Sequence, residues 1–378
     1  MTTPFITLAN NAREKSVRVF DHSHAGDVAR LFHKTFRGNK GSVPASLAPY
    51  LRELFLEHPW HDPELPSLVH VAEDGRVDGF IGVLPLRLTF EGRKIRAAVA
   101  GSLMVDDPEK KPLTGAKLMR KFIRGPQDIT VTESANAVAQ SLHAKLQGRL
   151  LPLTSMEWFK VFKPLGTGVA LASRSVGAVK LLAPFARLGD GLLSRVKSPW
   201  LEEARPASSG VFKSEDVDAN RIAAFALRAS AQFALRPDWD ESMVNWLLTH
   251  AAKKETYGPM ICRLVYGRGD APIGGYIVYL RPGGMAWVLQ IFAEIGRADP
   301  VVDDLVTYAR SRGALAVRGR SQPMLMEPLL KRGCVFVHRS ATIVHTNDEA
   351  LMAAASGNSL INGLAAESWS RLIGGEFR

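Results

Sequence analysis

The sequence predicts an α/β (α+β) fold with two tandem domains, each a mixed, mostly antiparallel sheet flanked by helices. Three observations support this prediction. The chain has 378 residues, which is enough for two domains of ordinary size. Short apolar runs typical of strands alternate with segments whose apolar residues recur at helical spacing. The order helix, helix, three strands, helix, strand, helix, strand occurs in the first half and again after residue 210.

The elements of the first half follow from periodicity and from turn signals. Asp74-Gly75 and Glu91-Gly92 are typical of tight hairpin turns, and they separate three apolar runs that we expect to be strands. The expected helices and strands are a strand over 17–20, helices over 24–36 and 45–57, strands over 68–73, 77–90 and 95–105, a helix over 113–124, a strand over 128–132, a helix over 136–147, and strands near 150–153 and 157–162.

The second half repeats this order of elements, with only faint identity between the two halves. Its expected elements are helices over 216–235 and 239–253, strands over 260–266, 273–280 and 285–293, a helix over 300–312, a strand over 314–318, a helix over 322–332 and a strand over 334–345. The chain then divides into a first domain over 1–163, a partly helical linker over 164–210, a second domain over 211–346 and a C-terminal tail helix over 347–378.

The composition is basic, with a formal net charge of +11. This charge favours an anionic partner, although a general solubility charge explains it equally well. The lysines and arginines are spread along the chain without a nucleic-acid-binding motif, so no nucleic acid is expected as a partner. The sequence has no signal-peptide pattern and no apolar run of about 20 residues, and its 2 cysteines lie far apart. We therefore expect a cytoplasmic protein.

Residues 104–148 carry the most informative local pattern. An apolar strand runs into the basic turn KKPLTG at 110–115, and a helix follows at once. This order places a helix N-terminus, with lysines beside it, at the end of a sheet. Anions are stabilised at helix N-termini by the unpaired amides and the helix dipole. The sequence therefore predicts a site for a phosphate-bearing cofactor.

This turn resembles the cofactor signature of the GNAT (GCN5-related N-acetyltransferase) superfamily, in which Arg/Gln-x-x-Gly-x-Gly/Ala follows a strand. Aligned without a gap, Lys110 takes the first position and Gly115 the last, while Leu113 replaces the first glycine. The resemblance implies two tandem GNAT-like domains, with an acyl-CoA bound by the first one. The cofactor-binding residues that it implies are Leu103, Met104, Val105, Lys110, Lys111, Leu113, Thr114, Gly115, Ala116 and Asn136.

The helix after this turn and strand resembles the family pattern Asn-x-x-Ala-x-x-Leu-Tyr more specifically. Here Asn136 opens the match and His143 takes the position of the tyrosine, which in the family often protonates the departing CoA thiolate. With its ordinary pKa of about 6.5, an imidazole can donate that proton. The alternative is a solvated helix residue. Glu133 is the candidate base, and its alternatives are a helix N-cap acid or a surface charge.

The resemblance implies direct attack of an amine on the thioester of acetyl-CoA or another acyl-CoA. The acceptor would be a small molecule, an amino sugar or a peptide, and a basic chain favours an anionic one. Divergence of strands 97–105 and 129–132 would expose backbone groups to the pantetheine arm. Two alternatives remain: a Fem-like or acyl-carrier-protein-dependent transferase, and a non-catalytic GNAT-derived binding protein. The sequence does not indicate the oligomeric state.

The second half lacks the cofactor signature. Its matching turn is crowded by Glu294, Asp299, Asp303 and Asp304, which opposes anion binding and predicts a groove or an interface instead. Basic and apolar residues alternate over 170–197, which fits either peripheral contact with a membrane or a packed linker. No metal is expected, because His58 and His61 have no clear third ligand.

Overall fold

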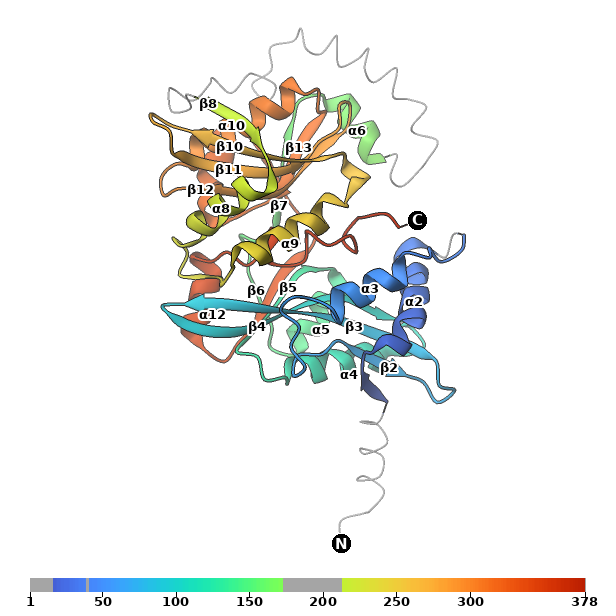
Figure 1. Ribbon diagram of the computed structural model, residues 1–378. Helices are drawn as coiled ribbons and strands as arrows, with labels where there is room; N and C mark the ends of the chain where they lie inside the picture. Colours follow the sequence, from blue (N-terminus) through green and yellow to red (C-terminus); the bar gives the residue numbers. More distant parts are fainter. Residues whose placement is uncertain (1–15, 39–40, 173–212, 378) are drawn as a thin grey trace. The chain divides into compact units, whose positions relative to one another are not determined.

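The computed structural model describes residues 16–38, 41–172 and 213–377 (Figure 1). They form two compact units. Unit 1 contains the described residues up to Leu151 together with Ser340–Ala355 and Phe377. Unit 2 contains Pro152–Arg339, apart from its undescribed part, and Ser356–Glu376. The predicted fold class is confirmed, because each unit is a mixed sheet flanked by helices.

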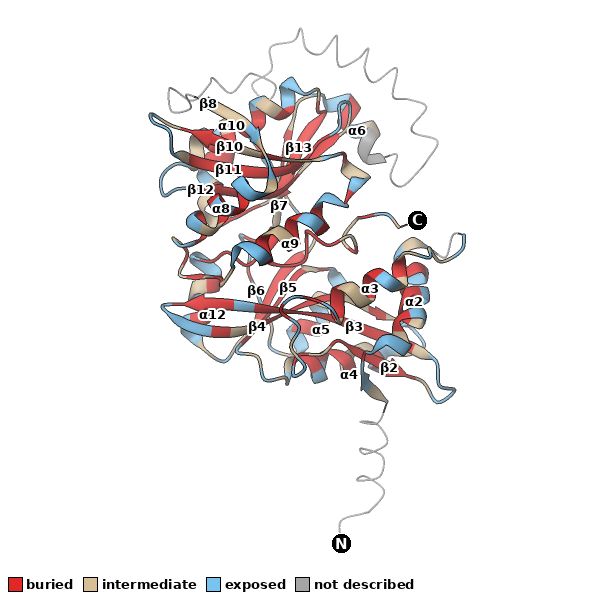
Figure 2. Cartoon of the chain, in the orientation of Figure 1, coloured by how far each residue is buried: buried red, intermediate tan, exposed pale blue. Residues whose placement is uncertain are grey.

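The sheet of unit 1 has the strand order β1-β2-β3-β4-β5-β15-β6. Its neighbouring strands are antiparallel except for β4 and β5, which are parallel. The strand bounds are β1 Val17–Val19, β2 Leu68–Val71, β3 Val77–Phe90, β4 Arg93–Val105, β5 Ile129–Ala135, β15 Ala341–His345 and β6 Arg149–Leu150. Figure 2 shows that the long central strands are buried along most of their length.

The helices of unit 1 are α2 Ala25–Arg37, α3 Leu47–Phe55, α4 Pro112–Ile123, α5 Ala137–Lys145 and α12 Glu349–Gly357, the last of which ends in unit 2. Helices α3 and α4 cover opposite faces of β3. A Cβ added at Gly82 would lie 2.4 Å from the Phe55 ring, whereas one at Gly79 would lie 2.7 Å from Thr114 Cγ2. Residues an odd number apart point to opposite faces of a strand. Glycine at both positions therefore lets two helices pack closely on the sheet.

The sheet of unit 2 has the order β14-β7-β13-β12-β11-β10-β8, with only β12 and β13 parallel. Its strands are β7 Met156–Val161, β8 Lys213–Val217, β10 Met260–Tyr266, β11 Pro272–Tyr279, β12 Met285–Ala293, β13 Ala316–Arg320 and β14 Val335–His338. The short strand β9, Leu235–Pro237, does not belong to this sheet. The helices of unit 2 are α6 Pro164–Ala172, α8 Ala219–Ser230, α9 Glu241–Ala252, α10 Ala298–Ser311 and α11 Met326–Lys331. Its short helices are η3 Glu255–Tyr257, η4 Pro323–Leu325 and η5 Gly363–Ala365, and unit 1 has the short helix η1 His22–His24.

Two strands do not join the sheet of the half in which the sequence places them. Strand β7, expected in the first domain, pairs with β13 and β14 in unit 2. The run expected as one strand over 334–345 divides at Arg339-Ser340, and its second part, β15, pairs with β5 and β6 in unit 1. The compact units therefore differ from the expected contiguous division, because an apolar pattern predicts a strand but not its pairing partner.

The predicted tail helix over 347–378 is wrong beyond Gly357. Helix α12 ends there, and the chain continues as turns with the short helix η5. These turns are buried in unit 2, with Leu364 at 0% exposure and Trp369 at 1%. Gly363 and Gly374 both have positive φ, which interrupts a helix. The predicted segment 170–197 lies outside the described residues, apart from the last residues of α6.

Candidate functional site

Strands β4 and β5 separate within the sheet of unit 1. They pair in parallel only from Ala97 with Ile129 to Val99 with Val131. Beyond this point β4 continues to Val105 on the edge of β3, and β5 continues on the edge of β15. The backbone of β4 after Val99 therefore has no strand partner, among the described residues, on the side that faces β5. This is the divergence that the sequence predicts.

A β-bulge lies within the free part of β4. Gly101 pairs with Gly82 and Met104 with Phe80, so β4 has one more residue than β3 between these pairs. Ser102 has a φ of 57°, a conformation that non-glycine residues adopt only in special places. Bulges redirect a strand and leave backbone groups outside the ladder. The bulge directly precedes Leu103, Met104 and Val105, the residues predicted to bind the pantetheine arm.

Helix α4 begins at the predicted basic turn. Pro112 is its first residue and has no backbone N–H to offer, and Lys111 at the N-cap makes no side-chain capping bond. The Leu113 side chain is 66% exposed, whereas Thr114 is buried against β3. Gly115 and Ala116 are partly buried, and Lys110 is exposed. The turn residues therefore lie together at the end of β4, as predicted.

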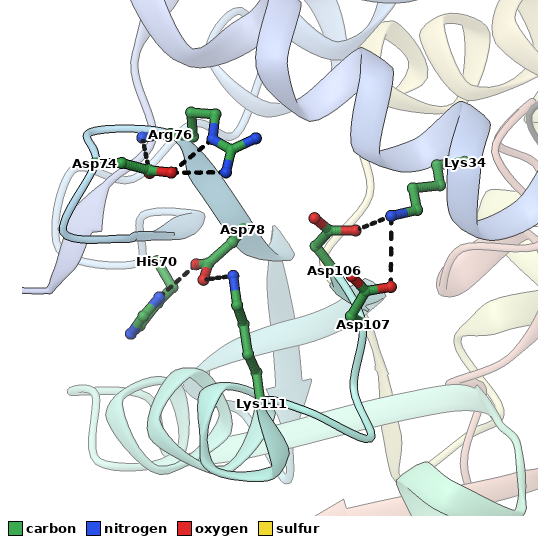
Figure 3. Close-up of polar contacts among 8 residues, drawn as sticks. All are labelled: Lys34, His70, Asp74, Arg76, Asp78, Asp106, Asp107 and Lys111. Carbon is green, nitrogen blue, oxygen red and sulfur yellow. Dashed lines mark hydrogen bonds and ion pairs between the residues drawn. The ribbon is translucent and has the colours of Figure 1, made fainter.

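Figure 3 shows that the lysines around this turn are held in ion pairs. Lys111 Nζ lies 2.8 Å from Asp78 Oδ2, and Asp78 Oδ1 accepts a 2.5 Å hydrogen bond from His70 Nδ1. Lys34 Nζ lies 2.5 Å from Asp106 Oδ1 and 3.5 Å from Asp107 Oδ1. Lys111 and Lys34 are thus already compensated by carboxylates of the same chain.

Helix α5 begins where the sequence predicts. The Asn136 side chain caps it by accepting a 2.9 Å hydrogen bond from the Ala139 N–H. This cap means that Asn136 has a structural function at the helix start, in addition to the cofactor contact implied by the resemblance. Glu133 is therefore not the N-cap acid, and it is not a surface charge either, because its side chain is fully buried at 0% exposure on β5.

His143 is not the solvated residue that the alternative predicted, since it is fully buried at 0% exposure. Its Nδ1 lies 2.8 Å from Nε2 of His345 on β15. Burial, reinforced by the charge of His345, lowers the pKa of His143 to about 4. The expectation that His143 donates a proton with its ordinary pKa is therefore wrong. Its buried imidazole is uncharged at neutral pH.

The two histidines meet through Nδ1 of His143 and Nε2 of His345, and a hydrogen bond with the Leu146 backbone partly offsets the lowering of the His345 pKa by burial. His143 Nε2 is buried with no partner among the described residues.

A second buried polar atom lacks a partner nearby in the chain. The Thr132 hydroxyl on β5 is buried and, like His143 Nε2, forms no hydrogen bond with any described residue. Other buried atoms of the described residues, such as His33 Nδ1 and Trp239 Nε1, also have no partner, so these two atoms do not mark a ligand site by themselves. They lie on β5 and α5, the two elements that follow the end of the β4–β5 pairing.

Three partners of the site were missed from the sequence. Asp78 and His70 lie in runs that predict ordinary strands. Asp78 follows the Asp74-Gly75 hairpin turn, and an acidic residue in that place does not by itself indicate a functional site. His345 is separated from His143 by 202 residues, so only the fold brings the two together. Gly148, which follows α5, is required by close packing, because a Cβ there would lie 2.7 Å from His345 Nε2.

The equivalent divergence in unit 2 is filled by the chain itself. Strands β12 and β13 pair only from Met285 with Ala316 to Trp287 with Arg318. Beyond these pairs, the Leu364 N–H donates to Gln290 Oε1 on β12 at 3.0 Å. A Cβ at Gly363 would lie 2.5 Å from the Leu289 carbonyl oxygen, which shows how closely the tail approaches β12.

Carboxamides hold the tail on the β13 side of this divergence. Gln322 Nε2 donates to Asn362 Oδ1 at 3.1 Å, and Asn362 Nδ2 donates to the Ser321 carbonyl at 3.2 Å. All three of these residues are buried, as are the apolar residues Leu360 and Ile361. We call residues 358–366 the tail plug.

The acidic turn of unit 2 forms internal ion pairs. Arg332, which is 4% exposed, binds Asp299 with a distance of 2.8 Å and also binds Asp303. Asp304 accepts from Arg263 at 3.1 Å and from the Tyr276 hydroxyl at 2.8 Å. A cavity of about 460 Å³ remains beside the start of α10, and Glu294 and Asp299 line it together with part of the tail plug. Asp299, Asp303 and Asp304 are thus held by partners within unit 2.

The part of the chain that the structure describes contains no group of three or more His, Cys, Asp or Glu side chains placed to hold a metal ion. His58 instead accepts a 3.0 Å hydrogen bond from the Trp60 N–H within its own loop. None of the described helices is long and apolar enough to cross a membrane.

The architecture matches solved structures, although no protein-family model and no curated protein matches the sequence. A probable N-acyltransferase from Enterococcus faecalis superposes with a TM-score of 0.58 at 8% identity, covering 87% of this chain and 71% of that one. GCN5-related N-acetyltransferases from Anabaena variabilis (TM-score 0.55, 11% identity, 88% and 73% covered) and Kribbella flavida (0.51, 12%, 88% and 71%) are similar as well. At these identities the likeness shows the fold.

Proposed function

We propose that this chain, which has the fold of the GCN5-related N-acetyltransferases, is an acyl-CoA-dependent N-acyltransferase with its donor site in unit 1. The observation that carries the proposal is the open edge of β4 opposite β5. Unpaired strand backbone forms hydrogen bonds readily with an amide-containing ligand. The pantetheine arm of an acyl-CoA contains two amides, so it suits this edge. Acetyl-CoA is the donor we expect.

The donor would lie along the residues that the resemblance implies. Its arm would pair with the backbone of Leu103, Met104 and Val105 just after the bulge. The phosphates would lie at the turn that begins α4, near the exposed Lys110 and the amides of Thr114, Gly115 and Ala116. The fit is good for the arm and weaker for the phosphates, because Pro112 offers no amide and Lys111 is paired.

The reaction is the transfer of an acyl group from sulfur to nitrogen. The free amine of the acceptor attacks the thioester carbonyl carbon, the carbon–sulfur bond breaks, and the thiolate leaves as the amide forms. The acceptor must lose a proton for this attack, and we assign Glu133 on β5 as the candidate base. His143 is assigned to hold α5 against β15 through His345, because its ring is buried against His345 and its lowered pKa keeps the imidazole uncharged at neutral pH.

We propose that unit 2 takes no donor. Where β12 and β13 diverge, the tail plug lies against Gln290 and Gln322. The expected stoichiometry is therefore one donor per chain. The acceptor is proposed to be an amine of a small molecule, an amino sugar or a peptide. The net charge of +11 favours an anionic one through long-range attraction.

A second candidate function is a non-catalytic binding protein with this fold. It is favoured by the burial of His143 and by the compensated charge of Lys111. Donor binding combined with an absence of transfer to any amine would favour this candidate. A protein that binds no donor at all would contradict both the enzyme and the site assigned here.

The donor site is tested by Gly115→Glu. A Cβ at Gly115 makes only an ordinary contact, 3.4 Å from Val105 Cγ2, so the fold should tolerate the change. The new carboxylate would lie at the proposed phosphate position, and we expect acetyl-CoA affinity to fall about two- to threefold. The measurement is the rise in thermal midpoint with acetyl-CoA, which reports binding to the folded state.

Gly168→Glu on the exposed surface of α6 is the matched control, since no atom lies within 4 Å of its added Cβ. It introduces the same charge on a helix of unit 2 and should leave the ligand-induced shift unchanged. An unchanged shift in Gly115→Glu would rule out the phosphate position proposed here.

A further inference from the structure

The ion pair between Lys111 and Asp78 is built into the interior of unit 1. Asp78 is 4% exposed and His70 is 7% exposed, whereas the Lys111 side chain reaches the surface and is 38% exposed. The Asp78 backbone carbonyl also accepts a 2.8 Å hydrogen bond from the Asp106 N–H. The turn before α4 is therefore fixed in position by the same residue that binds its lysine.

Both members of the pair are charged. Burial raises the pKa of Asp78, but hydrogen bonds from Lys111 and His70 outweigh burial and leave that pKa below its ordinary value. The hydrogen bond to Asp78 in turn raises the pKa of Lys111. A carboxylate and an ammonium 2.8 Å apart nearly cancel at the distance of a ligand. Lys111 therefore adds little attraction for phosphate.

The rest of the turn does not compensate for this loss. Lys34 is bound by Asp106 and Asp107, and Glu109 is exposed beside them. Carboxylates outnumber cations in this turn and its direct partners; the carboxylates are Asp78, Asp106, Asp107 and Glu109, and the cations are Lys34, Lys110 and Lys111. Net positive charge strengthens the attraction of a site for nucleotide phosphates, and this turn has none to add to the amides of the helix N-terminus.

On the premise of the function proposed above, we infer that Asp78 sets the donor preference of the site. By neutralising Lys111, it leaves the donor to be selected through its acylated pantetheine arm rather than through the phosphates of a nucleotide. The substrate class is then an acyl-pantetheine thioester, for which the nucleotide of CoA contributes little affinity. Asp78 acts through Lys111 and is a specificity-determining residue, not a catalytic one.

The test compares two probes on the full chain. Dissociation constants are measured by calorimetry for acetyl-CoA and for acetyl-pantetheine, which has the same arm without phosphates. For the wild type we expect the two constants to lie within about threefold of each other. Asp78→Asn keeps a hydrogen-bond acceptor for His70 and releases Lys111, so it should shift the ratio about three- to tenfold toward acetyl-CoA. Acetyl-pantetheine affinity should remain the same.

Two further variants isolate the pair. Asp74→Asn makes the same change of charge at an exposed residue that binds Arg76 at 2.6 Å, so it should change the ratio less than about twofold. Lys111→Met, at a partly exposed side chain, should shift the ratio away from acetyl-CoA, and Asp78→Asn combined with Lys111→Met should restore the wild-type ratio. If Asp78→Asn does not fold, Lys111→Met alone provides the comparison.

A wild type that prefers acetyl-CoA by a hundredfold would overturn the inference, as would Asp78→Asn or Lys111→Met with the wild-type ratio. An equal gain in Asp74→Asn would also overturn it, because the effect would then be general charge. These results leave the donor site intact. Failure of both probes to bind any folded variant would instead contradict the proposed function itself, and this inference with it.

Discussion

Replacing Gly363 by alanine is expected to lower the free energy of unfolding by about 2–5 kcal/mol. Gly363 has a φ of 66°, where a side chain costs about 1–2 kcal/mol. Its added Cβ would also lie 2.4 Å from Gln290 Oε1 and 2.5 Å from the Leu289 carbonyl oxygen. The Gln290 side chain can move, but the backbone oxygen cannot, and such overpacking costs about 1–3 kcal/mol more.

The matched control for this change is Gly296→Ala. Gly296 has a φ of 72°, yet no atom lies within 4 Å of its added Cβ. Both variants therefore carry backbone strain, and only Gly363→Ala carries the clash with β12. The measurement is the denaturant midpoint together with hydrogen exchange of the tail plug. Equal midpoints for the two variants would show that the tail plug does not approach β12 as described.

Acidification is expected to destabilise unit 1 through His143. The pKa of this residue is lowered from 6.5 to about 4 by burial and then by His345. Between these values the unfolded chain binds a proton that the folded chain does not. Stability is therefore unaffected by this group above pH 6.5 and falls as the pH decreases toward 4, at about 1.4 kcal/mol per pH unit. The total loss is about 3 kcal/mol, and the lowered pKa of His345 acts in the same direction.

His143→Asn is designed to remove this dependence without removing the hydrogen bond, since its amide can donate to His345 Nε2 in place of Nδ1. The measurement is the free energy of unfolding at a series of pH values. The variant should show a shallower fall between pH 6.5 and 4 than the wild type. His22→Asn changes an exposed histidine and should keep the wild-type slope. A slope that is unaltered in His143→Asn would contradict the lowered pKa of His143.

The elements of the fold could be predicted from the sequence, whereas the pairing of two strands could not. Helical periodicity and the Asp74-Gly75 and Glu91-Gly92 turns correctly placed the helices and hairpins that precede α4. Strands β7 and β15 were also expected, but their partners depend on tertiary packing between distant segments. The tail was expected to be one helix because its apolar residues fit helical spacing, yet those residues pack as turns in unit 2.

For the candidate site, too, the sequence predicts the local elements but not the partners that come from distant segments. The order of strand, turn and helix correctly located the starts of α4 and α5, and the family resemblance implied the divergence of β4 from β5. Sequence spacing could not show that Asp78 holds Lys111, because the two are joined only by the fold. For the same reason, it gave His143 the pKa of a solvated imidazole. Local pattern predicts where a site begins, but partners from distant segments decide its charge.

The central claim is that the donor binds where β4 and β5 diverge in unit 1. A crystal structure of the full chain with acetyl-CoA tests it most directly. The account predicts one donor per chain, with its pantetheine arm paired to the backbone near Leu103, Met104 and Val105, while the tail plug remains in unit 2. An arm bound between β12 and β13, or a chain that binds no donor at millimolar acetyl-CoA, would contradict it.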